Sequence, residues 1–313
     1  MKKNGSLQYR KAAEETEAYT TLHRLLPPIR TRSELLASVD EISAREYHKQ
    51  RFSLPEPTMK DVRDELLREA DSGDISEMMR SGTAEDYADE YCEREYSSMH
   101  SQWENARQCF ESTEQNVWEE QEQRKRSELE KLRLSLDAGE NYIASQAECV
   151  LSALQLPYKL SASAAADADG IWVEALMPGV ECIPNERATA GGRSVRSKTP
   201  KERKLDYVRH VFSTAVYLAG KMFCISPKVR RTVLSMFESC RDRNGEQAYR
   251  CILSAVFRRE MFEGVDWQSP DFSPQSFCEK SEIRFIVTPS GIMRKVKPFF
   301  AEKGHLPHGE FTV

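Results

Sequence analysis

Residues 199–223 read TPKERKLDYVRHVFSTAVYLAGKMF, and this stretch decides how the second half of the chain folds. It opens with the signals of a helix start, because Thr199 can cap the helix, Pro200 suits its first turn and Glu202 can reach back to the cap. Apolar residues then recur at helical spacing as far as residue 223, and Pro227 follows the end. We therefore predict a helix whose apolar face is broad enough to cover a β-sheet.

Strand-like runs lie on both sides of this helix. The predicted strands are residues 158–164, 170–177, 231–240, 248–258, 283–287 and, more weakly, 292–296. The first two are joined by an Asp- and Gly-containing turn, and Asn244-Gly245 indicates a second hairpin. A further helix is expected at 140–154, where Pro157 ends it. This order predicts an α+β fold in which an antiparallel sheet is covered by helices on one face.

The N-terminal half reads as charged helix. Shorter helices are predicted at 7–26, at 32–42 and from Thr58 onward, and the acidic stretch 71–90 is expected to form short helices or a loop. Between 96 and 136 no Pro or Gly occurs, which predicts one helix near 60 Å long. Its apolar stripe is typical of a coiled coil but lapses after Trp118, where Glu120 and Arg124 stand at i, i+4.

These elements divide the chain into three parts. We expect a helical region with a long charged helix at 1–137, an α+β domain at 140–300 and a flexible tail at 301–313. The boundary is placed at Asp137-Ala138-Gly139, because a glycine between two helices interrupts both of them.

Composition favours a cytoplasmic protein. The chain has 313 residues, of which 39% are hydrophobic and 30% are charged. It contains no run of about 18 apolar residues and no apolar signal-peptide core after its first residues, so neither membrane spanning nor secretion is expected. The eight cysteines form no Cys-x-x-Cys pair, and we interpret them as reduced thiols.

No motif in the sequence identifies a catalytic centre. Asp167, Asp169 and Glu174 lack the nearby lysine that a metal-dependent nuclease requires, so we interpret them as turn and strand residues. His210 has no Ser, Cys or carboxylate placed beside it by a motif, and a structural role is predicted for it. We predict neither a cofactor nor a bound metal.

Charge is strongly segregated along the chain. Residues 60–125 hold 19 acidic and 8 basic side chains, whereas residues 186–260 hold 17 basic and 7 acidic ones. Either the acidic part screens the basic domain, within one molecule or in a homo-oligomer, or the basic segment binds phosphates through solvated side chains. The candidate anion- or nucleic-acid-binding residues are Arg187, Arg193, Arg196, Lys198, Lys201, Arg203 and Lys204.

The order of features in 140–299 resembles the C-terminal region of an uncharacterised family of bacterial proteins. The marks are Gly170-Ile171-Trp172-Val173-Glu174 running into Pro178, a polar segment ending at Lys198, a helix through Tyr207 and Phe223, Ser226-Pro227, and Phe257-Arg258-Arg259-Glu260-Met261-Phe262. That family implies no catalytic role for any residue. We predict a non-enzymatic interaction or accessory protein of bacterial type, whose partner is another protein or a second copy. The alternative is a nucleic-acid-binding or nucleic-acid-processing protein of a defence system.

Overall fold

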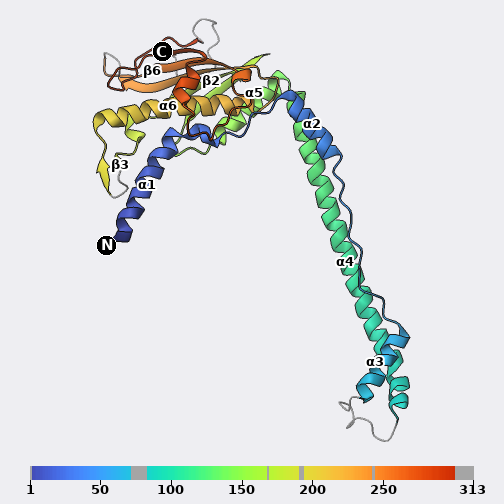
Figure 1. Ribbon diagram of the computed structural model, residues 1–313. Helices are drawn as coiled ribbons and strands as arrows, with labels where there is room; N and C mark the ends of the chain where they lie inside the picture. Colours follow the sequence, from blue (N-terminus) through green and yellow to red (C-terminus); the bar gives the residue numbers. More distant parts are fainter. Residues whose placement is uncertain (1, 72–82, 168, 190–193, 242–243, 300–313) are drawn as a thin grey trace. The chain divides into compact units, whose positions relative to one another are not determined.

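The computed structural model describes residues 2–71, 83–167, 169–189, 194–241 and 244–299 (Figure 1). For residues 2–10 and 71 it describes the backbone alone. Contacts between residues divide the chain into two units. The first unit comprises residues 1–39 and 131–313, and the second comprises residues 40–130. The expected tail at 301–313 and the candidate residue Arg193 lie outside the described residues.

The first unit is built around a five-stranded sheet in the order β1-β2-β5-β6-β7. Its strands are β1 (Ser161–Ala166), β2 (Gly170–Met177), β5 (Arg231–Arg241), β6 (Gln247–Arg258) and β7 (Glu282–Phe285). The predicted α+β class is confirmed, and so are the strands of both predicted hairpins. The sheet is mostly antiparallel, but β2 and β5 pair in parallel, because the chain between them crosses over through a helix and returns in the same direction.

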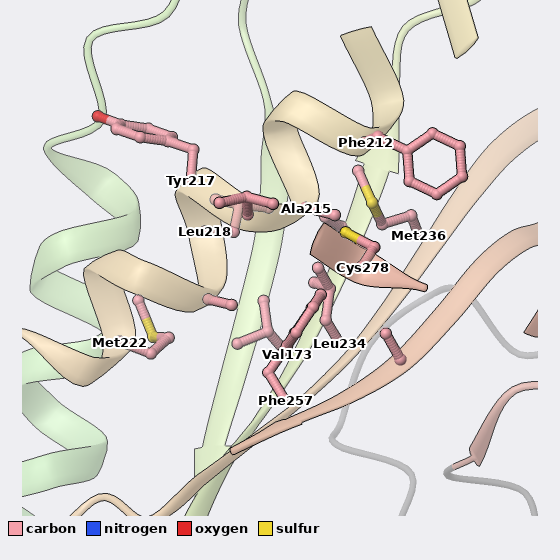
Figure 2. Close-up of a cluster of buried hydrophobic side chains, with 14 of the residues drawn as sticks. Val173, Phe212, Ala215, Tyr217, Leu218, Met222, Leu234, Met236, Phe257 and Cys278 are labelled. Atoms are coloured by element: carbon pink, nitrogen blue, oxygen red, sulfur yellow. The ribbon is translucent and has the colours of Figure 1, made fainter. Parts of the chain in front are cut away.

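The helix that makes this crossover is α6 (Pro200–Phe223), whose predicted start is confirmed in atomic detail. The Thr199 hydroxyl accepts a hydrogen bond from the Glu202 backbone N–H, and the Thr199 N–H donates to the Glu202 carboxylate at 2.9 Å. Together with α5 (Glu140–Ser152), α6 covers one face of the sheet. Phe212 of α6 and Phe257 of β6 lie in this core without exposed surface (Figure 2).

Shorter elements complete the first unit. They are the 3-10 turns η2 (Val180–Cys182) and η3 (Arg259–Met261), the two-stranded ribbon of β3 (Glu186–Ala188) and β4 (Val195–Ser197), and α7 (Pro274–Cys278). The predicted strand at 292–296 does not form, and that region makes an isolated bridge between Val287 and Met293. None of the helices in the described ranges combines the length with the apolar composition that a membrane-spanning segment needs.

The N-terminal residues belong to the same core. After α1 (Lys2–Thr20) and η1 (Leu22–Leu25), Leu22, Leu26 and Ile29 are buried with the side chains of α6. Leu26 packs directly on Gly220, where an added Cβ would lie 2.5 Å from the Leu26 Cδ1. The expected boundary at 137–140 therefore differs from the observed grouping, which joins residues 1–39 to the α+β core.

The second unit consists of the end of α2 (Arg32–Ser43), α3 (Met59–Asp71) and the larger part of α4 (Ala84–Leu136). The helix α4 starts earlier than predicted, so the described part of the acidic stretch is helical from residue 84 and is not a loop. Thr83 caps it, because its hydroxyl accepts a hydrogen bond from the Asp86 backbone N–H at 3.2 Å, and the Thr83 N–H in turn donates to the Asp86 carboxylate at 2.9 Å. The segment between α2 and α3 runs along α4, where the Trp103 indole N–H donates to the Leu54 carbonyl at 3.0 Å.

Candidate functional site

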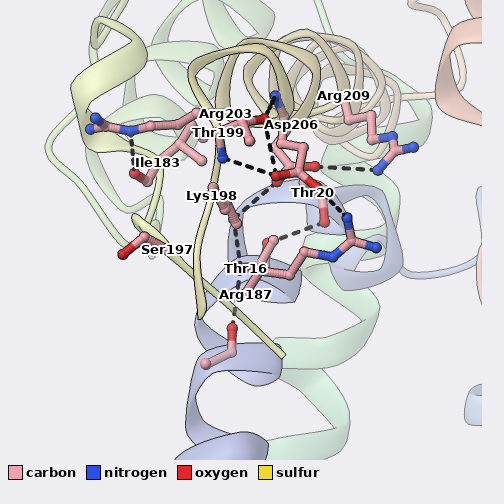
Figure 3. A network of polar contacts seen from close by, with 12 residues as sticks. Thr16, Thr20, Ile183, Arg187, Ser197, Lys198, Thr199, Arg203, Asp206 and Arg209 are labelled. Carbon is pink, nitrogen blue, oxygen red and sulfur yellow. Dashed lines mark hydrogen bonds and ion pairs between the residues drawn. The ribbon is translucent and has the colours of Figure 1, made fainter. Parts of the chain in front are cut away.

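The basic segment forms the β3–β4 ribbon and the start of α6 (Figure 3). Antiparallel pairing places Arg187 opposite Arg196, so both guanidinium groups approach the first turn of the helix. There the Glu202 carboxylate accepts hydrogen bonds from Arg187 at 2.6 Å and from Arg196 at 2.5 and 3.0 Å. The Arg196 hydrogen bond, followed by that of the Thr199 N–H, holds the pKa of Glu202 far below its usual range. One carboxylate thus serves two cations and leaves one positive charge in excess.

Lys198 is not the solvated side chain that the sequence suggested. It is only 7% exposed, and its ammonium group lies 2.9 Å from the Asp206 carboxylate and donates to the Thr16 hydroxyl at 2.9 Å. These two partners come from α6 and α1, so Lys198 ties the N-terminal helix to the core helix (Figure 3). A buried charge with these two partners stabilises the contact between the two helices, because removing it would leave a partner unpaired.

The remaining candidates divide into two kinds. Arg203 donates to the backbone carbonyls of Glu181 at 2.8 Å and Ile183 at 3.1 Å, so it braces the turn after β2. Lys201 is exposed and Lys204 is half-buried, and neither has a carboxylate partner among the described residues. The structure therefore brings the candidate cations together, but it uses most of them internally.

A hollow of about 370 Å³ lies beside this network. Its walls carry the cations Arg187, Lys198 and Arg209, but also the carboxylates of Glu202 and Asp206. An anion that entered it would meet negative as well as positive groups, and the carboxylates would oppose its binding. This mixture favours an internal ion network over a dedicated phosphate site.

The acidic residues near the first hairpin have separate roles. The Asp167 carboxylate accepts hydrogen bonds from Arg231 at 2.7 Å, from the Trp172 indole at 2.9 Å and from the Asp169 N–H at 2.9 Å, which makes it a turn residue. Glu174 lies on β2, on the opposite side of the strand from the residues that pack against α6. No group of three His, Cys, Asp or Glu that could hold a metal ion occurs among the described residues.

Glu174 itself is a buried carboxyl that sequence reasoning did not identify as such. It is 3% exposed, and burial raises its pKa to about 7. Strand pairing places it between Ser163 of β1 and Ser235 of β5, and the same row continues through Ser254 of β6. A polar row thus crosses the sheet face that α6 does not cover.

Two histidines occupy the contact between α6 and the N-terminal residues. His210 is fully buried, with its Nδ1 3.0 Å from the Tyr19 carbonyl oxygen, and burial lowers its pKa to about 4. The His23 Nδ1 lies 3.0 Å from the Ser213 hydroxyl oxygen, and burial likewise lowers the pKa of His23 to about 4. Ser213 has no exposed surface, so this Ser–His pair offers no access for a substrate. The sequence could not reveal the pair, because its members are 190 residues apart.

No protein-family model matches this chain, and no curated protein or solved structure matches it. The resemblance to a bacterial family thus stays a prediction, and function has to be inferred from the geometry of the chain.

Proposed function

We propose that this chain is a non-enzymatic interaction protein whose second unit, residues 40–130, contacts another protein or a second copy of the chain. The observation that carries the proposal is the surface of α4. All residues of this helix are described, and none between positions 93 and 135 is buried. Among the described residues of the unit, one cluster of four buried side chains forms its core: Val62, Leu66, Ala88 and Cys92.

A helix of this kind receives little stability from burial within its own chain. Pairs such as Glu120 and Arg124, whose groups lie 2.5 Å apart at i, i+4, support it locally. Helical segments in proteins otherwise depend mostly on the packing of one face. The segment before α3 runs along α4 without burying any residue between 93 and 135, so much of the helix surface remains free to contact a partner.

The same unit has apolar side chains that a partner could cover. Leu54, Met59 and Tyr91 are 58%, 49% and 37% exposed. The unit also holds 25 acidic and 12 basic residues, a formal charge of −13. A partner surface with apolar pockets and a basic rim would complement it, and the excess of basic residues at 186–260 makes a second copy one such partner.

Site-specific photo-cross-linking tests this proposal. Benzoylphenylalanine is placed at Tyr91, and in a matched control at Ile286, which is 49% exposed in the first unit. We expect a discrete product from position 91 alone, which disappears in a Leu54→Ser/Met59→Ser background and re-forms from the purified components. A product of twice the chain mass identifies a second copy. If position 91 gives no product beyond that of the control, the second unit is not a contact surface.

Nucleic-acid binding is the second candidate. It is favoured by the one positive charge that remains when Arg187 and Arg196 share the Glu202 carboxylate, and by Lys201 and Lys204. Its test is a fluorescence titration with a labelled DNA duplex at about 50 and 200 mM salt. In the variant Arg187→Gln/Lys201→Gln/Lys204→Gln, the salt dependence should become shallower by about three units of slope, one for each lost phosphate contact. Lys198 is left intact because it is buried. No binding at the lower salt concentration would eliminate this candidate.

A further inference from the structure

A hollow in the first unit lies between α5 and the C-terminal end of α6, away from the β3–β4 ribbon. It encloses about 710 Å³, within the usual range for small-molecule sites. Six parts of the chain meet there: residues 27–30, Leu35 of α2, the last turns of α4 from Lys131, one face and the end of α5, the chain from Tyr217 to Pro227, and Arg259. All of these residues belong to the first unit.

The walls of the hollow are largely apolar. The residues that line it are Leu132 of α4, Tyr142 and Val150 of α5, Leu154 just after the end of α5, and Tyr217 of α6. All but Tyr217 are half-buried, although each faces neighbouring elements of the same unit. The half-buried side chains would lose further contact with water if an apolar group filled the space, which favours binding in proportion to the area covered.

The charged residues of the hollow have one sign. Arg30, Lys131, Lys221 and Arg259 line it, and no Asp or Glu is among its lining residues. Arg259 is engaged already, since it pairs with Glu263 at 2.8 Å and donates to the carbonyls of Phe223 and Ser226. The other three have no carboxylate partner among the residues that the structure describes.

The position of one of these three cations has an explanation that requires no ligand. Lys221 lies in the last turn, where a positive charge complements the helix dipole. Lys131 belongs to α4 and Arg30 to the segment before α2, so that dipole gives no reason for their position. Lys221 also lies over the Tyr217 ring and Arg30 donates to the Ser38 hydroxyl, but neither contact neutralises a positive charge. An apolar cavity rimmed by cations without carboxylate partners is complementary to a molecule with an apolar body and an anionic head.

From this complementarity we propose that the hollow binds an amphipathic organic anion, with its apolar body against α5 and its anionic head near Lys131 and Lys221. The proposal is independent of the partner contact assigned to the second unit.

Isothermal titration calorimetry with three probes tests it. Dodecanoate has the tail and the charge, dodecyltrimethylammonium has the same tail with the opposite charge, and propionate has the charge without the tail. We expect dodecanoate, below its micelle concentration, to bind at one site per chain, and the other two to show no saturable binding at equal concentrations. Lys131→Gln/Lys221→Gln should raise the Kd for dodecanoate roughly tenfold, because two nearby charges are lost. Lys228→Gln removes the same charge from an exposed residue that does not line the hollow, and should change nothing.

A second readout locates the ligand. Cys224 is exposed and lines the hollow, whereas Cys149 is exposed but does not line it. Dodecanoate should slow thiol labelling of Cys224, measured by peptide mass spectrometry, and leave that of Cys149 unchanged. Ala153→Trp, at an exposed residue of the wall, should abolish both the protection and the binding heat. Equal binding of the two dodecyl probes, the absence of binding, or unchanged binding in Ala153→Trp would each overturn the proposal.

Discussion

The helices α4 and α6 differ in the interactions that stabilise them. In α6, 15 of 24 residues are buried, and they pack against the sheet on one side and against the N-terminal residues on the other. In α4, which the structure describes completely, 3 of 53 residues are buried: Ala88, Cys92 and Leu136. The helix α6 depends on buried long-range packing, whereas α4 combines local pairs between neighbouring turns with largely exposed contacts to residues 45–54. Substitutions should therefore cost much more in α6 than in α4.

Phe212→Ala is expected to give the largest effect. The side chain is fully buried between α6 and the sheet, so its loss leaves a cavity and should reduce the free energy of unfolding by about 4 kcal/mol. Urea unfolding gives the magnitude, and peptide-resolved hydrogen exchange should show faster exchange in α6 but not in α4. A loss below about 1 kcal/mol would mean that Phe212 does not lie in a tightly packed core.

Lys198→Met should come next, at about 3 kcal/mol, because it leaves the carboxylate of Asp206 partly buried without its ammonium partner. Exchange should accelerate in the described part of α1 as well as in α6. The double variant Lys198→Met/Asp206→Asn should regain part of the loss. Lys201→Met is the matched control at an exposed position of the same segment. An equal loss there would contradict the conclusion that Lys198 stabilises the contact between α1 and α6.

Glu174 makes the stability of the first unit depend on pH. Its pKa rises from 4.5 to about 7 on folding, so the unfolded chain loses the proton at lower pH than the folded chain. The contribution of Glu174 to the free energy of unfolding is fully present below about pH 4.5, falls as the pH rises toward 7 and levels off above it. Glu174→Gln should remove most of this fall, on the order of 2 to 3 kcal/mol between pH 5 and 8. Urea unfolding at both pH values measures it, and Glu148→Gln, at an exposed residue, should keep the fall.

Arg124→Gln in α4 should have the smallest effect. It breaks the exposed pair with Glu120, and such pairs contribute less than about 0.5 kcal/mol. Circular dichroism at 222 nm should show nearly unchanged helix content. A loss above about 1 kcal/mol would show that α4 depends on this surface more than its exposure implies, and would weaken the contrast between the two helices.

Much of the first unit follows from local signals in the sequence. The capping residues Thr199 and Glu202, the apolar face around Phe212 and the turn at Asn244-Gly245 specify the helix and the second hairpin without reference to distant residues. The parallel pairing of β2 with β5 could not be predicted from these local signals, because the direction of a strand after a long connection depends on how the crossover helix packs on the sheet.

Long-range contacts explain what was missed at the candidate site. Lys198 reads as one more cation of a polar segment, and its burial depends on Thr16, 182 residues away. The pairing of Arg187 and Arg196 with Glu202 depends on a ribbon of two short strands that have no apolar alternation. The early start of α4 depends on Ala88 and Cys92 packing against Val62 and Leu66 of α3.

The close approach of Leu26 to Gly220 has a consequence for how this sequence can evolve. A side chain at position 220 would collide with the leucine, and a larger residue at position 26 would collide with the helix backbone. Each position therefore sets which residues the other can accept. A lineage that acquires alanine at 220 should carry a smaller residue at 26, and recombination that separates the two would combine incompatible halves. Two sites almost 200 positions apart would then be inherited as one unit.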